Sequence, residues 1–200
     1  DVVIETANRA EVATWADDLY ASMGATVKLA DHGNQRQFLP DTMGALRNEQ
    51  TPLYMLLKDL QRRHKLDAVG LQYHLFSHKP EDVEDYRNHL LSPAHLYEVL
   101  DWYARLGLPL RIFEITLPGY ELVEDGEAFQ AELLEKLYRI WFSHPAVQEI
   151  TWWSLVDGTA AYAPRNTDEG ENFFKGGLVY YDISRKQGYE VLSRLINEEW

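Results

Sequence analysis

The sequence predicts an α/β protein whose strands run parallel in one sheet. Five short runs of apolar, β-branched or aromatic residues recur along the chain, and amphipathic helical patterns separate them. The runs are almost continuously apolar, which is typical of strands that are buried on both faces. Such strand–helix alternation favours a parallel sheet covered by helices. The predicted strands span residues 1–5, 26–31, 66–74, 108–114 and 149–157.

Helices are predicted between and after these strands. Residues 11–23 carry apolar side chains every three to four positions, which indicates one buried helical face. The helix over 52–66 follows Thr51 and begins with Pro52, and the helix over 92–106 opens with Ser92 and Pro93; a hydroxyl residue followed by proline is a typical helix start. Two more are expected over 129–142 and 186–199. No linker or shift in composition divides the 200 residues, so we expect a single domain over 1–200.

The composition narrows the classes of function. Hydrophobic residues make up 46% of the chain, enough for a sizeable core. The chain has 19 Lys and Arg against 32 Asp and Glu, a net charge of −13, which repels nucleic acids and anionic membrane surfaces. The absence of cysteine excludes disulfides, thiolate metal sites and cysteine nucleophiles. No His/Asp pattern has the spacing of a catalytic metal site, so we expect neither metal nor cofactor.

Each predicted strand ends in an ionisable residue. The carboxyl ends of parallel strands meet on one face, where α/β folds build their sites. Two of the five residues are glutamates, and paired carboxylates suit the cleavage of a glycosidic bond. The alternative is that polar residues simply mark where strands stop. The five are Glu5, Asp31, His74, Glu114 and Asp157.

Aromatic side chains near the strand ends favour a sugar ligand, because flat rings stack on the C–H faces of pyranoses. The candidates are Tyr73, Trp152, Trp153 and Tyr162. Trp152 and Trp153 are neighbours on one strand and point to opposite faces, so we expect one in the core and the other at the site. The alternative for all four is packing in the core.

Three segments carry a resemblance to a known family. LDAVGLQYH (66–74), LPLRIFE (108–114) and FSHPAVQEITWWSLVDG (142–158) resemble, in order and spacing, strands six to eight of glycoside hydrolase family 10, the retaining endo-β-1,4-xylanases. Residues 1–5 (DVVIE) resemble the end of that family's fourth strand. The resemblance implies a (β/α)₈ TIM barrel to which this chain supplies strands four to eight. An open flavodoxin-like sheet is the alternative, and the order of the motifs argues against it.

The resemblance also implies roles for individual residues. Glu114 resembles the nucleophile and Glu5 the general acid/base of a two-carboxylate double displacement. His74 and Gln72 resemble residues that orient the nucleophile, and Trp153 resembles the platform under the sugar. The other residues that are expected to contact or orient substrate are Tyr162, Asp31 and Asp157.

The implied substrate is a β-1,4-linked plant-wall polysaccharide such as xylan. No cofactor, nucleic acid or membrane is implied, and secretion is favoured. The first three strands of the barrel are expected to come from another segment of the same protein, which is therefore an expected partner.

Departures from the family pattern support a second interpretation. Ile4 stands where the family has an asparagine that donates to the sugar 2-hydroxyl, and such bonds strengthen in the transition state. Phe113 and Ser154 also replace family residues. Ile4 favours a catalytically weakened or inactive carbohydrate-binding relative, whereas the retained Glu114, His74 and Gln72 favour the enzyme. The match over 143–157 argues against an unrelated α/β binding domain.

Overall fold

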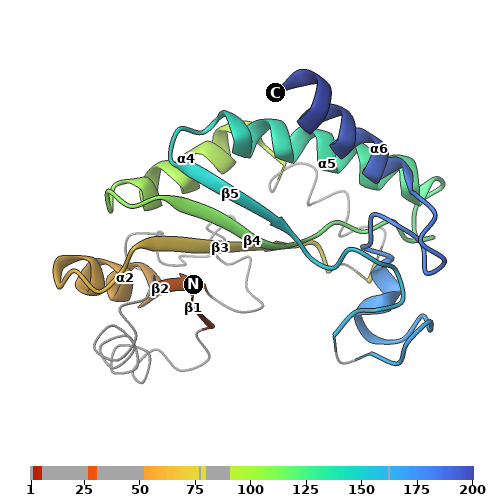
Figure 1. The fold of residues 1–200 in the computed structure, drawn as a ribbon, viewed down its shortest axis with the longest axis horizontal. Coiled ribbons are helices and arrows are strands. Elements are labelled where there is room, and N and C mark those ends of the chain that lie inside the picture. The colour runs from red at the N-terminus through yellow and green to blue at the C-terminus, as the bar shows by residue number, and fades with distance from the viewer. Residues whose placement is uncertain (1, 6–26, 31–51, 77, 80–90, 162) are drawn as a thin grey trace.

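A computed structural model describes residues 2–5, 27–30, 52–76, 78–79, 91–161 and 163–200. Within the described part, the strands form one parallel sheet in the order β1-β2-β3-β4-β5, which is also their order in the chain (Figure 1). A parallel sheet is therefore confirmed. The strands are β1 (Val2–Glu5), β2 (Val27–Ala30), β3 (Ala68–His74), β4 (Leu110–Thr116) and β5 (Val147–Trp152).

Two of the predicted strand ends were wrong. β4 continues past Glu114 to Thr116, because an extra residue is accommodated inside the strand and pairing then resumes. β5 ends at Trp152, five residues before Asp157. The chain leaves the sheet there, and Val156 pairs instead with Val179, which lies in the segment that precedes the last helix.

The predicted helices agree with the structure, apart from 11–23, which lies outside the described residues. They are α2 (Pro52–Arg62), α4 (Pro93–Ala104), α5 (Gly126–Ser143) and α6 (Gln187–Arg194), which continues into η4 (Leu195–Glu199). Ser92 caps α4 by accepting a hydrogen bond from the His95 amide, and Asp125 caps α5 in the same way at Ala128. None of the helices in the described ranges is long and apolar enough to cross a membrane.

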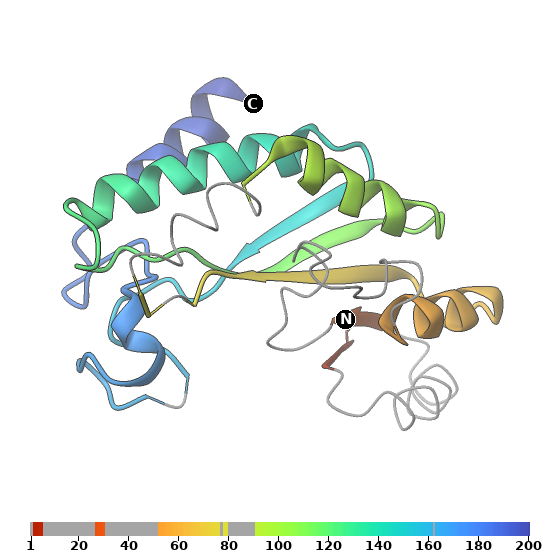
Figure 2. The same cartoon turned by 180° about the vertical axis from the view of Figure 1, so that it is seen from behind.

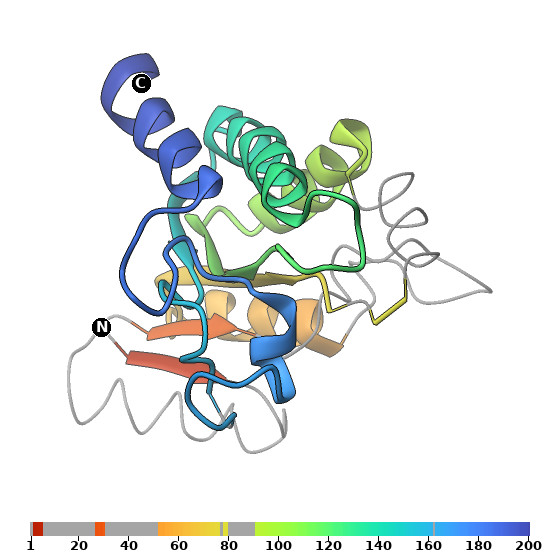
Figure 3. The same cartoon turned by 90° about the vertical axis from the view of Figure 1, so that its right-hand side faces the viewer.

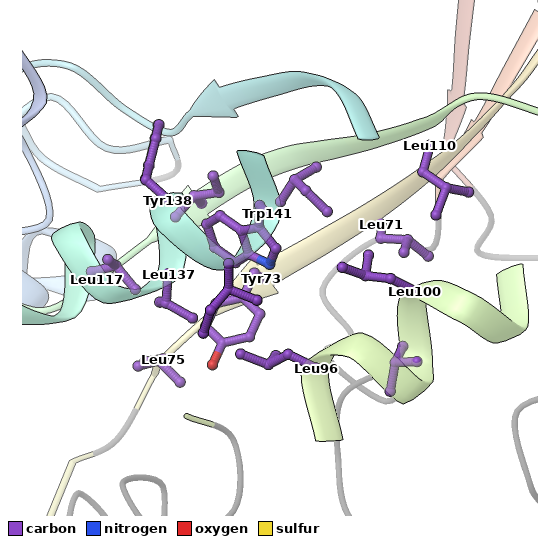
Figure 4. Packing of buried hydrophobic residues seen from close by; sticks show 14 of the residues in the cluster. Leu71, Tyr73, Leu75, Leu96, Leu100, Leu110, Leu117, Leu137, Tyr138 and Trp141 are labelled. Carbon is purple, nitrogen blue, oxygen red and sulfur yellow. The ribbon is translucent and has the colours of Figure 1, made fainter. Parts of the chain in front are cut away.

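The core lies between the sheet and the helices that pack on one of its faces. Figure 4 shows Leu71 and Tyr73 of β3 and Leu110 of β4 packed against α4 and α5. The rings of Tyr73 and Trp141 meet edge to face at 5.2 Å, and both are fully buried. Burial also raises the pKa of Tyr73, because the phenolate form would lose its hydration.

Helices α4–α6 lie along a face of the sheet, whereas the chain segment after β5 lies beyond the carboxyl ends of the strands. α4, α5 and α6 run along one face of the sheet (Figures 1 and 3). The segment after β5, which includes the short helix η3 (Gly170–Phe174), lies beyond the carboxyl ends of β3–β5. Seen from behind, it is at the opposite end of the sheet from the point where α2 leads into β3 (Figure 2). The carboxyl ends of β3–β5 are therefore the part of the sheet over which this segment folds.

Charged residues hold the last helix on α5. Arg139 and Arg194 both pair with Glu135, at 2.8 Å and 3.0 Å, and both also pair with Glu199. Hydrogen bonds from Arg139 and Arg194 hold the pKa of Glu135 below its usual value of 4.5. A carboxyl whose pKa is depressed on folding stabilises the fold above its unfolded pKa, and this contribution disappears as the pH falls through the folded pKa.

We expect Glu135→Gln to lower the free energy of unfolding by under about 1 kcal/mol at pH 7, since the pair is partly exposed and screened by water. The difference from wild type should shrink as the pH falls through the depressed pKa of Glu135, because protonation removes the charge with which the two arginines pair. Urea unfolding at a series of pH values from 7 downwards measures it. A difference that stays constant over the whole series would contradict the assignment.

Candidate active site

The candidate site is built around a β-bulge that contains Glu114. Gln72 of β3 pairs with Phe113 and Tyr73 pairs with Ile115, so Glu114 is an extra residue with no partner position on β3. β5 shows the same offset, because Ile112 pairs with Ile150 and Ile115 with Trp152. Glu114 has a φ of 48°, in the left-handed region that few non-glycine residues adopt. Bulges of this kind redirect a side chain, and they are frequent next to active sites.

His74, the last residue of β3, faces Glu114. The His74 Nε2 atom lies 3.8 Å from the Glu114 Oε2 atom, and their side chains are 5% and 19% exposed. Gln72, two positions earlier on the same face of β3, is fully buried. The structure thus brings together three of the residues predicted for the site, in an environment that excludes most water.

Thr116 joins this group, and sequence reasoning missed it. Its Oγ1 atom lies 2.9 Å from His74 Nδ1, and its hydroxyl donates to the Trp153 carbonyl oxygen at 3.2 Å. The only signal in the sequence was its position, two residues after the predicted nucleophile. That signal depends on the bulge, because an unbroken alternation would put Glu114 and Thr116 on the core face with Leu110 and Ile112.

The two tryptophans lie in different surroundings. Trp152 packs against the core beside Tyr138 and donates from its Nε1 atom to the Gly176 carbonyl at 3.0 Å. Trp153 lines a narrow hollow together with Thr116 and Asp157. The suggestion that Tyr73 faces a sugar was wrong: it lies between Gln72 and His74 on β3 and therefore points to the opposite, helix-covered face.

Asp157 belongs to a buried ion pair. Its Oδ2 atom accepts from Lys186 Nζ at 3.0 Å, and its Oδ1 atom accepts from the Gly177 amide at 2.7 Å. Lys186 is only 2% exposed and also donates to the Lys175 carbonyl oxygen at 2.7 Å. A Cβ atom on Gly177 would lie 2.4 Å from the Asp157 nitrogen, so only glycine fits there. Both carboxylate oxygens of Asp157 thus accept hydrogen bonds from the protein itself. Any influence of Asp157 on substrate therefore acts through the loop that these bonds anchor.

An aromatic groove lies next to His74. The Phe76 ring stacks on the His74 ring at 4.9 Å and 9°. Beyond it, a hollow of about 500 Å³ is lined by Phe76, His78, Phe173 and Phe174, with the acidic residues Asp168 and Glu171 also present. This groove was not predicted, because its aromatic residues come from two segments nearly 100 positions apart in the chain.

The remaining predicted residues are described only in part. Glu5 ends β1 and pairs with Ala30, at the same end of the parallel sheet as His74. Asp31 and Tyr162 lie outside the described residues. Within the described ranges, no group of three or more His, Asp or Glu side chains could hold a metal ion.

We expect Lys186→Met to lower the free energy of unfolding by about 3–5 kcal/mol, because it leaves the Asp157 carboxylate buried without its counter-charge. Lys175→Met is the matched control: Lys175 pairs with Glu121 at 3.0 Å, but Glu121 is 90% exposed. That change should cost under about 1 kcal/mol. Urea unfolding of both variants at pH 7 measures these losses. Equal losses would mean that the buried pair contributes no more to stability than the exposed pair.

Comparison with known proteins finds a sequence family and a set of solved structures that the chain resembles. The model of glycosyl hydrolase family 10 matches residues 42–175. No protein of curated function matches the chain in sequence.

Solved structures share the fold at low identity. Xylanase 10B from Thermotoga petrophila RKU-1, solved with xylobiose, is 18% identical with a TM-score of 0.63, over 95% of this chain and 52% of its own. The intracellular xylanase TsXylA from Thermoanaerobacterium saccharolyticum JW/SL-YS485 is 13% identical with a TM-score of 0.62, over 90% of this chain and 48% of its own. Xyn10B from Clostridium thermocellum, in complex with xylohexaose, is 16% identical with a TM-score of 0.64, over 94% and 33%.

This chain spans about half the length of the first two structures. At these identities the structural likeness speaks for the fold, which is that of part of a (β/α)₈ barrel. The family model, which covers more than half of the 200 residues, carries the assignment further. The chain therefore belongs to glycosyl hydrolase family 10.

Proposed function

We propose that this chain is the part of a retaining glycoside hydrolase that carries the nucleophile, and that the enzyme cleaves β-1,4-linked, xylan-like polysaccharide. One observation supports this most directly: a bulge at Glu114 sets a carboxylate beside the buried His74 at the carboxyl end of the sheet. The family match covers both residues. The xylobiose and xylohexaose in two of the similar structures support a xylan-type substrate.

The proposed reaction is a double displacement at the anomeric carbon. The Glu114 carboxylate attacks that carbon while Glu5, as the acid, protonates the departing glycosidic oxygen. Glu5 then removes a proton from water, which attacks the same carbon and releases Glu114. This mechanism requires carboxyl groups about 5–5.5 Å apart. Glu5 ends β1 at the same end of the sheet as Glu114, which supports the pairing.

Other residues of the chain have supporting roles in this proposal. Gln72 and His74 orient Glu114, and Trp153 forms the platform under the sugar at the cleaved bond. Tyr162 and Asp31 contact the substrate, as predicted from the sequence. The aromatic groove lined by Phe76 and Phe173 suits the C–H face of a further pyranose. Hollows of several hundred Å³ are typical of ligand sites.

We further infer that β1–β5 are strands four to eight of the barrel and that residues 1–200 form part of one catalytic domain. β1 and β5 are the edges of the described sheet. All seven residues of β3 are buried, whereas none of the six in β5 is fully buried. Exposed edges of this kind are normally covered, and closure of a barrel removes them. Three further βα units of the same protein would supply that closure.

A second function is favoured by one specific residue. Ile4 cannot donate a hydrogen bond to the sugar 2-hydroxyl, and the loss of such a bond weakens transition-state stabilisation. A protein that binds xylo-oligosaccharides without cleaving them is therefore the competing candidate. Isothermal titration with xylohexaose, alongside an assay for released sugar, separates the two: heat of binding with no release would favour this second function.

We expect Glu114→Gln to reduce hydrolysis of an aryl β-xylobioside by at least about 10³-fold, because an amide cannot form the glycosyl–enzyme intermediate. The full-length protein should be used, with release of the phenol as the readout. Glu121→Gln is the matched control, since Glu121 is 90% exposed, and it should leave the rate unchanged. If Glu114→Gln kept full activity, the nucleophile would have to be sought elsewhere.

The acid role of Glu5 is expected to depend on the leaving group. Glu5→Ala should slow the hydrolysis of xylohexaose strongly, because a sugar alkoxide needs a proton to depart. A dinitrophenyl β-xylobioside needs none, so its first step should be slowed little and the glycosyl–enzyme should accumulate as a burst. The rate of the first step with each substrate provides the test, and equal losses in that rate on both would remove Glu5 as the acid.

A further inference from the structure

We propose that Thr116 is a positioning residue: its hydroxyl holds a proton on Nδ1 of His74 and thereby presents Nε2 to Glu114. The inference deepens the proposed function, because it assumes that Glu114 is the nucleophile. It is carried by one continuous set of contacts, from the Trp153 carbonyl through Thr116 to His74 and on to Glu114.

The direction of the hydrogen bonds follows from the groups involved. A threonine hydroxyl has one hydrogen, and a carbonyl oxygen can only accept. The Thr116 hydrogen is directed to the Trp153 carbonyl oxygen, at 3.2 Å. Towards His74 Nδ1, at 2.9 Å, the Thr116 oxygen must then accept, so Nδ1 carries the hydrogen.

The hydrogen on Nδ1 determines which form of His74 Nε2 faces the Glu114 carboxyl group. With its hydrogen on Nδ1, a neutral imidazole would turn the lone pair of Nε2 towards the Glu114 oxygen, 3.8 Å away, and two acceptors repel. An ionised Glu114 therefore requires His74 to be protonated on both nitrogens. The attacking form of the site is then an imidazolium–carboxylate pair, in which the cation favours the ionised nucleophile. Hydrogen bonds of this kind are often long in an empty site and tighten with substrate.

Packing explains why threonine fits this role. Thr116 is 5% exposed, and a Cβ atom on Gly176 would lie 2.8 Å from its Cγ2 methyl group. The methyl therefore occupies space that only a glycine leaves open. Because a β-branched side chain has few χ1 choices, seating the methyl against Gly176 aims the hydroxyl at His74. The residue is held by packing on one side and by two hydrogen bonds on the other.

The test compares Thr116→Val, which keeps the shape and loses the hydroxyl, with Thr116→Ser, which keeps the hydroxyl. Ring ¹⁵N shifts of His74 are read by NMR in full-length protein labelled at histidine, with the signal assigned through a His74→Gln variant. Wild type should show Nδ1 protonated at every pH at which the fold persists. Thr116→Val should shift the neutral ring to the Nε2–H form, and Thr116→Ser should restore Nδ1–H.

Two NMR results would overturn the proposal. One is a neutral His74 that carries its hydrogen on Nε2 in wild type, a reading that requires no variant to fold. The other is a folded Thr116→Val protein with the wild-type shifts. Since neither measurement involves turnover, both remain decisive even if the protein hydrolyses nothing, in which case only the proposed function fails.

Kinetics give the second readout. Thr116→Val should lower kcat for an aryl β-xylobioside by roughly 10- to 100-fold, as small misplacements of a reacting group do. KM should be unchanged, because Thr116 acts through His74 and does not contact the sugar. Thr116→Ser should recover most of kcat. A loss in KM alone, or no rescue by serine, would assign Thr116 to packing only.

Discussion

The candidate site depends on one extra residue in β4. Leu110, Ile112 and Ile115 all lie in the core cluster, so the spacing between core positions changes from two residues to three at Glu114. Without the extra residue, strict alternation would turn Ile115 away from the core and Thr116 towards it. Burial of an isoleucine side chain contributes about 1.5–3 kcal/mol, whereas a non-glycine residue at positive φ costs about 1–3 kcal/mol. Core packing can therefore offset the strained backbone that directs Glu114 and Thr116 towards His74.

The loop after β5 depends on a different kind of interaction. Lys186 begins the last helix, and its buried amine bridges Asp157 and the Lys175 carbonyl oxygen. A well-packed apolar pair could match the stability of such a buried ion pair, but it would not require so specific a geometry. Here the geometry joins the segment that follows Trp153 to the start of α6. The position of the sugar platform proposed at Trp153 is thus tied to the C-terminal helix as well as to the sheet.

Much of the fold was predictable, because it rests on local patterns. Continuous apolar runs identified β3 and β4, and Ser92-Pro93 located the start of α4 to within one residue. The placement of His74 at the end of β3 followed in the same way. The burial of Tyr73 in the core could also have been predicted, because alternation along a strand places Tyr73 on the opposite face from His74.

The rest could not be predicted, because it depends on non-local contacts. A bulge is a property of pairing between strands, and nothing in LRIFEIT marks which residue is extra. Nothing in the local sequence marks Lys186 as buried, because its partner is a carboxylate 29 positions earlier. Gly176 and Gly177 each leave space that another side chain or backbone group occupies, and those neighbours come from other parts of the chain.

The two halves of the proposed chemistry differ in how far this chain determines them. His74, Glu114, Thr116 and Trp153 come from three adjacent strand segments, β3 to β5, that hydrogen-bond to one another. Their arrangement relative to one another is therefore supported by the pairing of β3, β4 and β5 within the sheet. Glu5 ends β1, at the far edge of the same sheet. In a closed barrel, the distance across the mouth depends on strand number and stagger. The approach of the proposed acid to the proposed nucleophile is thus a property of closure, whereas neighbouring strands of this chain already bring the proposed nucleophile next to His74.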